Sequence, residues 1–118
     1  MAQEIVMSVS LSFTKGSATV SRNSGSTYVT VSGSTYNAQV ASIATSDTPL
    51  DLGGVTTNGF ILLHNLDATN YITLGEDGSS YPIKLLAGEW GLVRWNGAAI
   101  HAKAHTGACL LEYVLISD

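Results

Sequence analysis

The stretch HNLDATNYITLG, residues 64 to 75, holds the densest group of side chains that could do chemistry. His64, Asp67 and the two asparagines Asn65 and Asn70 fall within seven positions, a density that suits a metal or catalytic cluster. The same residue types are also what a tight bend needs, because Asn and Asp side chains bond nearby backbone amides and tolerate left-handed backbone. Apolar alternation on both sides indicates two strands, so we expect the group to organise the bend between them.

The spacing of the other histidines and acids argues against a metal site. His101 and His105 are four residues apart, which on a strand separates them by roughly 13 Å, too far to share an ion. The segment Glu76-Asp77-Gly78 resembles a fragment of a calcium loop, but the D-x-D-x-D-G series and its closing Glu are missing. We expect no metal and no other cofactor.

Nucleophilic and acid–base catalysis also lack a signature. No G-x-S-x-G motif is present, and Cys109 lies in the apolar run ACLLEYVLI, where we expect a small buried side chain. Asp67, Glu76 and Asp77 fall in predicted turns, which favours solvated loop acids over the paired carboxylates of a glycoside hydrolase. Glu112 interrupts an apolar strand, so we expect it at a rim or paired with a base such as Arg94. The sequence predicts that the protein is not an enzyme.

Composition and charge exclude further classes of protein. The 118 residues fit one domain, 12% of them are charged, and their net charge is −4. The five Lys and Arg residues are scattered and form no basic stripe for nucleic acid. No signal peptide is visible, and no apolar run approaches the roughly 20 residues of a membrane span. With a single cysteine, this predicts a soluble product of a reducing cytoplasm that binds neither nucleic acid nor membrane.

The first half of the chain predicts strands with hydroxyl-rich faces. Apolar residues alternate cleanly from Glu4 to Phe13, which indicates one half-buried strand. The tetrapeptide GSTY occurs at 25 to 28 and again at 33 to 36, which suggests a hairpin turning near Ser32-Gly33 or a chance likeness in a Ser/Thr-rich segment. Residues 37 to 46 fit both helical and extended periods, and the neighbouring β signals favour extended structure.

The second half is a series of short strands separated by turn residues. Asn96-Gly97 predicts a hairpin between LVRW and AAIHAKA. The last strand, ACLLEYVLIS, is apolar on both faces and therefore belongs in the middle of a sheet covered on both sides. Its second cover is the rim of the opposite sheet or a neighbouring subunit. The predicted fold is all-β, a single-domain antiparallel β-sandwich or jelly roll of about nine or ten short strands over residues 1–118.

Carbohydrate binding is the main alternative that the residues suggest. Exposed aromatics of jelly rolls stack on sugar rings, and Trp90, Trp95, Tyr71 and Tyr81 could form such a platform. Trp95 alternates with Val93 ahead of a turn, a pattern more typical of a core. A surface this poor in charge is also suited to being covered by another subunit.

Three stretches resemble small structural proteins of tailed bacteriophages: GFILLHNLDATNYITLG, PIKLLAGEWGLVRW and IHAKAHTGACLLEYVLISD. The opening MAQEIVMSVSLSFTKG is similar to the start of such proteins but less specific. The resemblance implies a β-sandwich virion component that acts as a trimer or another symmetric oligomer. The implied role is a capsid decoration (cement) protein that clamps neighbouring major capsid subunits; a tail or appendage component is the alternative.

The expected partners are further copies of the chain and the major capsid protein, and the expected location is the virion. An N-terminal strand or arm, residues 1–16, could exchange between subunits and extend a neighbour's sheet. The candidate interface consists of apolar and aromatic residues from the predicted strands: Ile5, Met7, Val9, Leu11, Tyr28, Tyr36, Trp90 and Tyr113.

Overall fold

A computed structural model describes residues 3–118 and contains twelve strands and, within this range, no helix. The predicted all-β fold is confirmed, with more strands than the nine or ten expected. Contacts divide the chain into two compact units, one ending at Ser32 and the other spanning Gly33–Asp118. We call them unit 1 and unit 2 and describe each by itself. That residues 1–118 fold as one domain stays a prediction, as does the exchange of residues 1–16 between subunits.

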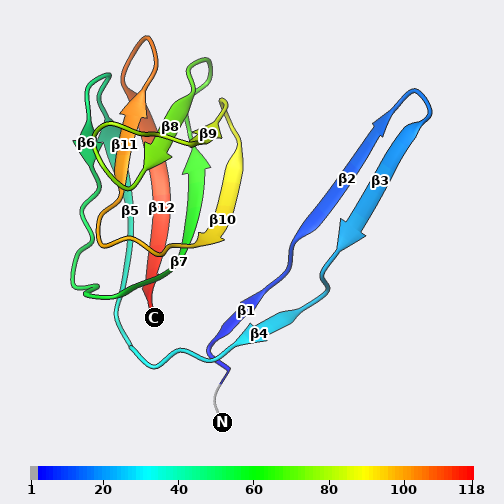
Figure 1. The fold of residues 1–118 in the computed structure, drawn as a ribbon, viewed down its shortest axis with the longest axis horizontal. Helices are drawn as coiled ribbons and strands as arrows, with labels where there is room; N and C mark the ends of the chain where they lie inside the picture. The colour runs from blue at the N-terminus through cyan, green and yellow to red at the C-terminus, as the bar shows by residue number, and fades with distance from the viewer. Residues whose placement is uncertain (1–2) are drawn as a thin grey trace. The chain divides into compact units, whose positions relative to one another are not determined.

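Unit 2 is a sandwich of two four-stranded antiparallel sheets (Figure 1). We name the first the long-strand sheet, with order β10-β7-β12-β5, and the second the short-strand sheet, with order β6-β11-β8-β9. The eight strands are β5 (Tyr36–Ile43), β6 (Thr48–Pro49), β7 (Asn58–Asn65), β8 (Ile72–Gly75), β9 (Ile83–Leu85), β10 (Trp90–Arg94), β11 (His101–Ala104) and β12 (Cys109–Ser117).

The strand pairing of unit 2 is that of a jelly roll. The first of the eight strands pairs with the last, β5 with β12, and the second with the seventh, β6 with β11. The third then pairs with the sixth, β7 with β10, and the fourth with the fifth, β8 with β9. This nested order of antiparallel pairs is the double-sheet arrangement expected from the sequence.

The core lies between the two sheets because alternate residues of the strands point inward. Ile61 and Leu63 of β7 and Leu111 of β12 are buried against Ile72 and Leu74 of the short-strand sheet. Strand β12 lies between β7 and β5, so its predicted central place is confirmed. The predictions that Trp95 and Cys109 are buried are also confirmed.

Two predicted hairpins are wrong. The turn at Asn96-Gly97 connects β10 in the long-strand sheet with β11 in the short-strand sheet, so it is a crossover between layers. The second GSTY leads into β5, which pairs with β12 over eight residue pairs, whereas the first leads into β4 of unit 1, which pairs with β1. The long pairing of β5 with β12, which is distant in the sequence, outweighs the local turn signal at Ser32-Gly33. Residues 37 to 46 are extended through Ile43, as expected.

Unit 1 is a two-stranded ribbon (Figure 1). Its strands are β1 (Ile5–Met7), β2 (Ser10–Lys15), β3 (Ala18–Asn23) and β4 (Thr27–Val29), with β1 paired to β4 and β2 to β3. Gly16, at φ 59°, turns the chain between β2 and β3. None of its described residues is buried. The prediction of one half-buried strand over Glu4–Phe13 is therefore wrong. The strand is interrupted between Met7 and Ser10, and a ribbon of two strands leaves both of its faces uncovered.

Candidate functional site

The outer face of the long-strand sheet is apolar, although such a face normally meets water. The outward positions follow from the strand register. One row across the four strands runs from Val40 through Glu112 and His64 to Trp90, and a second runs from Ala38 through Val114 and Leu62 to Leu92. We call the surface the outer apolar face; its apolar members are Tyr36, Ala38, Val40, Phe60, Leu62, Trp90, Leu92, Leu110, Val114 and Ile116.

Several members of this face are more exposed than apolar side chains usually are in a folded domain. Tyr36 is 70% exposed, Trp90 58%, Val40 52% and Leu110 51%. They lie on three different strands, so the exposure spreads across the sheet and is not confined to one edge. A contiguous apolar surface of this kind is typical of a contact with another molecule.

The polar groups of the outer apolar face are paired with one another or with its rings. Oε1 of Glu112 lies 3.3 Å from Nδ1 of His64, and the His64 ring stacks on Trp90 with centroids 3.8 Å apart. Arg94 lies over the ring of Phe60, 4.4 Å from its centroid, and its Nη1 is 2.7 Å from Oδ1 of Asp118. The expected pair of Glu112 with Arg94 is therefore wrong, because the register of β7 and β12 places Glu112 beside His64 instead.

The outer face of the short-strand sheet is polar by contrast. Thr73, Lys84 and Lys103 occupy one row of its register. Nζ of Lys84 lies 4.3 Å from the centroid of the Tyr71 ring, which also stacks on His105 at 4.5 Å. The two outer faces of unit 2 therefore differ in chemistry, and the apolar one stands out as the candidate functional surface.

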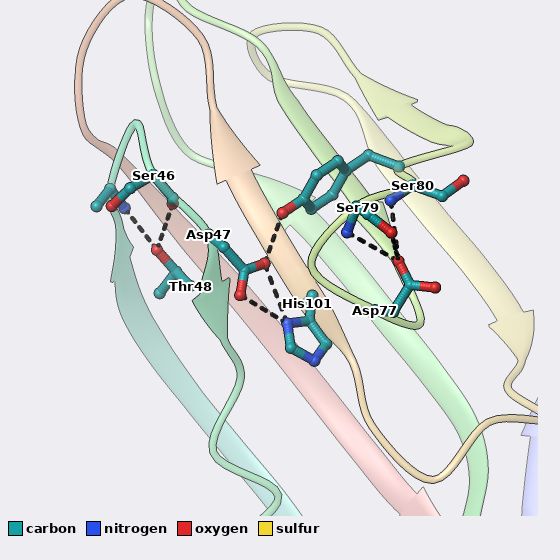
Figure 2. A network of polar contacts seen from close by, with 9 residues as sticks. Ser46, Asp47, Thr48, Asp77, Ser79, Ser80 and His101 are labelled. Atoms are coloured by element: carbon teal, nitrogen blue, oxygen red, sulfur yellow. Dashed lines mark hydrogen bonds and ion pairs between the residues drawn. The ribbon is translucent and has the colours of Figure 1, made fainter.

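A second candidate is a polar cluster centred on Asp47, shown in Figure 2. Its carboxylate accepts a hydrogen bond of 2.6 Å from the Tyr81 hydroxyl and lies 2.9 Å from Nδ1 of His101. The hydrogen bond from Tyr81, followed by that of His101, holds the pKa of Asp47 below its usual value. The same bond raises the pKa of Tyr81 to about 12. The cluster ties together the loop before β6, the loop after β8 and strand β11.

The hydrogen bonds of the Asp47 cluster do not include a nucleophile among the described residues. An Asp–His pair serves acyl transfer only when the imidazole also bonds a nucleophile. Within residues 3–118, the side-chain bonds of His101 go to Asp47, and no serine, threonine or cysteine bonds to its ring. Nearby Asp77 accepts bonds from Ser79 and Ser80 and shapes its own loop, as Figure 2 shows.

The bend from Asn65 to Asn70 is built by its own side chains, as the sequence predicted. Asn65 is fully buried; its Nδ2 donates to the carbonyls of Asn70, Leu85 and Leu86, and its Oδ1 accepts from the amide of Asp67. The carboxylate of Asp67 in turn accepts the amides of Asn70 and Thr69, which lowers the pKa of Asp67. These groups are occupied by the backbone and are not available for chemistry.

A hollow of about 420 Å³ lies where β7 and β10 approach Asp118. Asn58, Arg94 and Trp95 line it, and Arg94 is already paired with Asp118. Oδ1 of Asn58 is buried and, among the described residues, is the side-chain atom left without a hydrogen-bond partner. The hollow offers a place for a small polar group but no pair of acids or bases for catalysis.

No three His, Cys, Asp or Glu side chains of residues 3–118 are grouped as metal ligands. His101 bonds Asp47, whereas His105 stacks on Tyr71. Burial raises the pKa of Cys109, so its thiol is a poor nucleophile. No helix in this range is long and apolar enough to span a membrane.

The predicted interface residues fall in three places. Tyr36 and Trp90 lie on the outer apolar face, and Ile5, Met7, Val9, Leu11 and Tyr28 lie in unit 1. Tyr113 is fully buried, where its hydroxyl donates to the carbonyl of Asp51 and accepts from Gln39. The alternation of β12 points the Tyr113 side chain between the two sheets, so Tyr113 is not part of the exposed surface.

The ribbon of β2 and β3 has two unlike faces. One carries Leu11, Phe13, Ala18 and Val20 together with the cations Lys15 and Arg22, since Leu11 pairs with Arg22, Phe13 with Val20 and Lys15 with Ala18. The other presents only hydroxyl and amide side chains, those of Ser10, Ser12, Thr14, Thr19, Ser21 and Asn23. Leu11 is 60% exposed and Phe13 48%. We call the first the apolar ribbon face.

No protein-family model, curated protein or solved structure matches the chain. The candidate site therefore rests on the geometry of the described residues. Sequence reasoning missed the outer apolar face as a unit, although alternate residues of β7 (Phe60 and Leu62) and of β5 (Ala38 and Val40) are apolar at the outward positions. It had no signal for the Asp47 cluster, whose three members are far apart in the sequence.

Proposed function

We propose that the protein is a structural subunit that works by surface-to-surface assembly. The outer apolar face carries this proposal, because a β-sandwich that functions alone would dress that face with polar side chains. Unit 1 supports it: a two-stranded ribbon is at best marginally stable in water, so its apolar side chains need a partner surface. Assembly buries both kinds of surface without needing an active site.

The specific role proposed is capsid decoration in a tailed bacteriophage, as the sequence resemblance implies. In this role the protein forms a trimer or another closed oligomer on the particle and clamps neighbouring major capsid subunits. A jelly roll is compatible with this role, since capsid proteins use the fold, but lectins use it as well. A tail or appendage component would need the same surfaces in fewer copies.

The test is to add purified protein to expanded capsids that lack decoration and to pellet the particles. Saturable binding near one copy per major capsid subunit, with delayed heat disruption of the particle, is the expected result. A variant with Val40→Ser and Leu110→Ser on the outer apolar face should bind more weakly. Lys103→Ser on the polar face is the matched control. Failure to bind capsids at micromolar protein would refute the decoration role, and binding at low tens of copies would indicate a tail position.

Trp90 provides the one observation that favours a glycan-binding module instead. Trp90 is 58% exposed and its ring stacks on the His64 ring, as a sugar-stacking platform requires. Binding on a glycan array that is lost with Trp90→Ala but kept with Trp90→Phe would support this second function. An equal loss of capsid binding in Trp90→Ala and Trp90→Phe would instead favour a role of Trp90 in packing against a partner subunit.

A further inference from the structure

We propose that the outer apolar face of one copy is covered by the apolar ribbon face of a second copy, with Arg22 meeting Glu112. This inference rests on the proposed assembly function but not on the virion role. It names the partner of the outer apolar face as another copy of this chain. It also gives the ribbon of β2 and β3 a definite task in the assembly.

The ribbon is suited to pack as a second layer on a sheet. Its six-residue strands span roughly 20 Å, and the eight- and nine-residue strands β5, β7 and β12 span roughly 27–30 Å. Sheets stack through faces of alternate side chains, and both surfaces present such a face. Leu11, Phe13 and Val20 supply the apolar side chains that would lie against the uncovered ones of β5 and β12.

Charge complementarity favours the ribbon as the occupant. Glu112 lies inside the outer apolar face, 47% exposed, with His64 as its ion-pair partner at 3.3 Å. A cover that brings a cation there avoids leaving the carboxylate poorly paired once water is displaced. Arg22 projects from the apolar ribbon face beside Leu11, and its Nη1 bonds only the carbonyl of the neighbouring Ser21 among the contacts of residues 3–118.

Pairing of two outer apolar faces is the competing arrangement, and its charges are less favourable. A two-fold contact through this face would bring Glu112 of one copy toward Glu112 of the other in a region of low dielectric. It would also leave the apolar ribbon face uncovered in both copies. The ribbon arrangement covers both surfaces, either reciprocally in a two-fold dimer or head-to-tail in a ring or filament.

Cross-linking between two cysteine variants of the full chain tests the contact directly. Val20→Cys in one preparation is mixed with Val40→Cys in the other, and a short bismaleimide is added. A covalent dimer that forms only in the mixture is expected. Ser21→Cys, the neighbour of Val20 on the hydroxyl face, is the matched control and should not cross-link. The wild-type protein, whose Cys109 is buried, controls for background.

Charge reversal gives a second, independent readout by sedimentation. Arg22→Glu and Glu112→Arg should each raise the dissociation constant of self-association at least tenfold, and the double variant should restore it to within about threefold of wild type. Lys103→Glu changes the net charge by the same amount as Arg22→Glu, but on the polar face, and should have no effect. Circular dichroism checks that each variant remains folded.

The outcomes separate this inference from the proposed function. Cross-linking of Val40→Cys with itself would overturn the ribbon contact in favour of the two-fold arrangement. A monodisperse monomer at every concentration would overturn self-association altogether. Capsid binding that persists in either case would leave the proposed function standing, whereas a cross-linked oligomer that fails to bind capsids would refute the decoration role alone.

Discussion

Leu110 and Leu111 are neighbours in the chain and lie on opposite faces of the long-strand sheet. Leu111 is completely buried between the two sheets, whereas Leu110 is 51% exposed on the outer apolar face. Two adjacent leucine side chains of β12 therefore have different roles: one belongs to the core and the other to the surface. This relationship separates the side chains that the sandwich buries in folding from those that it leaves exposed.

Leu111→Ala should destabilise the protein far more than Leu110→Ala. Truncating a buried leucine leaves a cavity and costs about 2–5 kcal/mol, whereas a surface substitution usually changes stability by less than about 0.5 kcal/mol. Urea unfolding of dilute protein measures both. At higher concentration Leu110→Ala should additionally weaken self-association, because bound copies stabilise one another. Equal losses for the two variants would mean that Leu110 is part of the core.

Asn65→Ala should cost about 2–4 kcal/mol, because it removes the partner of three carbonyls, that of Leu85 being buried, and of one amide. Those bonds connect the bend after β7 with the segment after β9. Thr69→Ala, in the same bend, is the control and should cost less than about 1 kcal/mol. Chemical denaturation of both variants measures the difference. A loss below 1 kcal/mol for Asn65→Ala would contradict its structural role.

The fold could be predicted because the alternation of apolar residues is strong in unit 2. The central place of β12 follows from its two apolar faces, but these did not show which face points inward, so Tyr113, which is buried, was expected at an interface. The bend at Asn65 could be predicted for a similar reason, since its hydrogen bonds join residues close in the sequence. Local chemistry was sufficient for these features.

Strand pairing and the candidate surface could not be predicted, since both depend on distant contacts. The turn at Asn96-Gly97 has the residues of a hairpin, but β11 pairs instead with β6 and β8 in the other sheet. Asp47 meets Tyr81 and His101 only because the jelly roll brings β6 beside β11. The amphipathic alternation in Glu4–Phe13 predicted burial, but none of the described residues of unit 1 is buried, because a two-stranded ribbon has no second layer.

Tyr113→Phe should cost about 1–2 kcal/mol, because the hydroxyl donates to Asp51 at 2.7 Å and accepts from Gln39 at 2.6 Å in the core. Burial raises the pKa of Tyr113 to about 12, so the hydroxyl stays protonated and the loss should be constant from pH 6 to 9. Tyr36→Phe, on the outer apolar face, is the matched control with no measurable cost. Thermal unfolding of the two variants compares them; identical melting curves would contradict the prediction.

Gly75→Ala should destabilise the protein by about 2–3 kcal/mol or more through overpacking. A methyl group there would overlap the backbone carbonyl of Ser80 and approach Cα of Tyr81 to 3.1 Å. Gly54→Ala is the control, since nothing lies within 4 Å of its added carbon and its backbone is not left-handed. That variant should be neutral or slightly more stable, because alanine restricts the unfolded chain. A neutral Gly75→Ala would mean that the loop after β8 moves freely.

Asp47→Asn should destabilise the protein at neutral pH, and the difference from wild type should disappear in acid. Because hydrogen bonds from Tyr81 and His101 hold the folded pKa of Asp47 below 3.8, the carboxylate stabilises the fold above that pH. This contribution is lost as the pH falls through the lowered pKa. Unfolding midpoints of both proteins from pH 2 to 8 measure the effect, with Glu76→Gln as a control for loss of one exposed carboxylate.

Tyr81→Phe should show the opposite dependence on pH. The bond to Asp47 raises the folded pKa of Tyr81 to about 12, so its contribution is complete below pH 10 and is lost as the pH rises through 12. The deficit of Tyr81→Phe relative to wild type should therefore be constant from neutral pH to about pH 10 and shrink above it. Double substitution with Asp47→Asn should cost less than the two single losses together, because both remove the same hydrogen bond. Strict additivity would show that Tyr81 and Asp47 act independently.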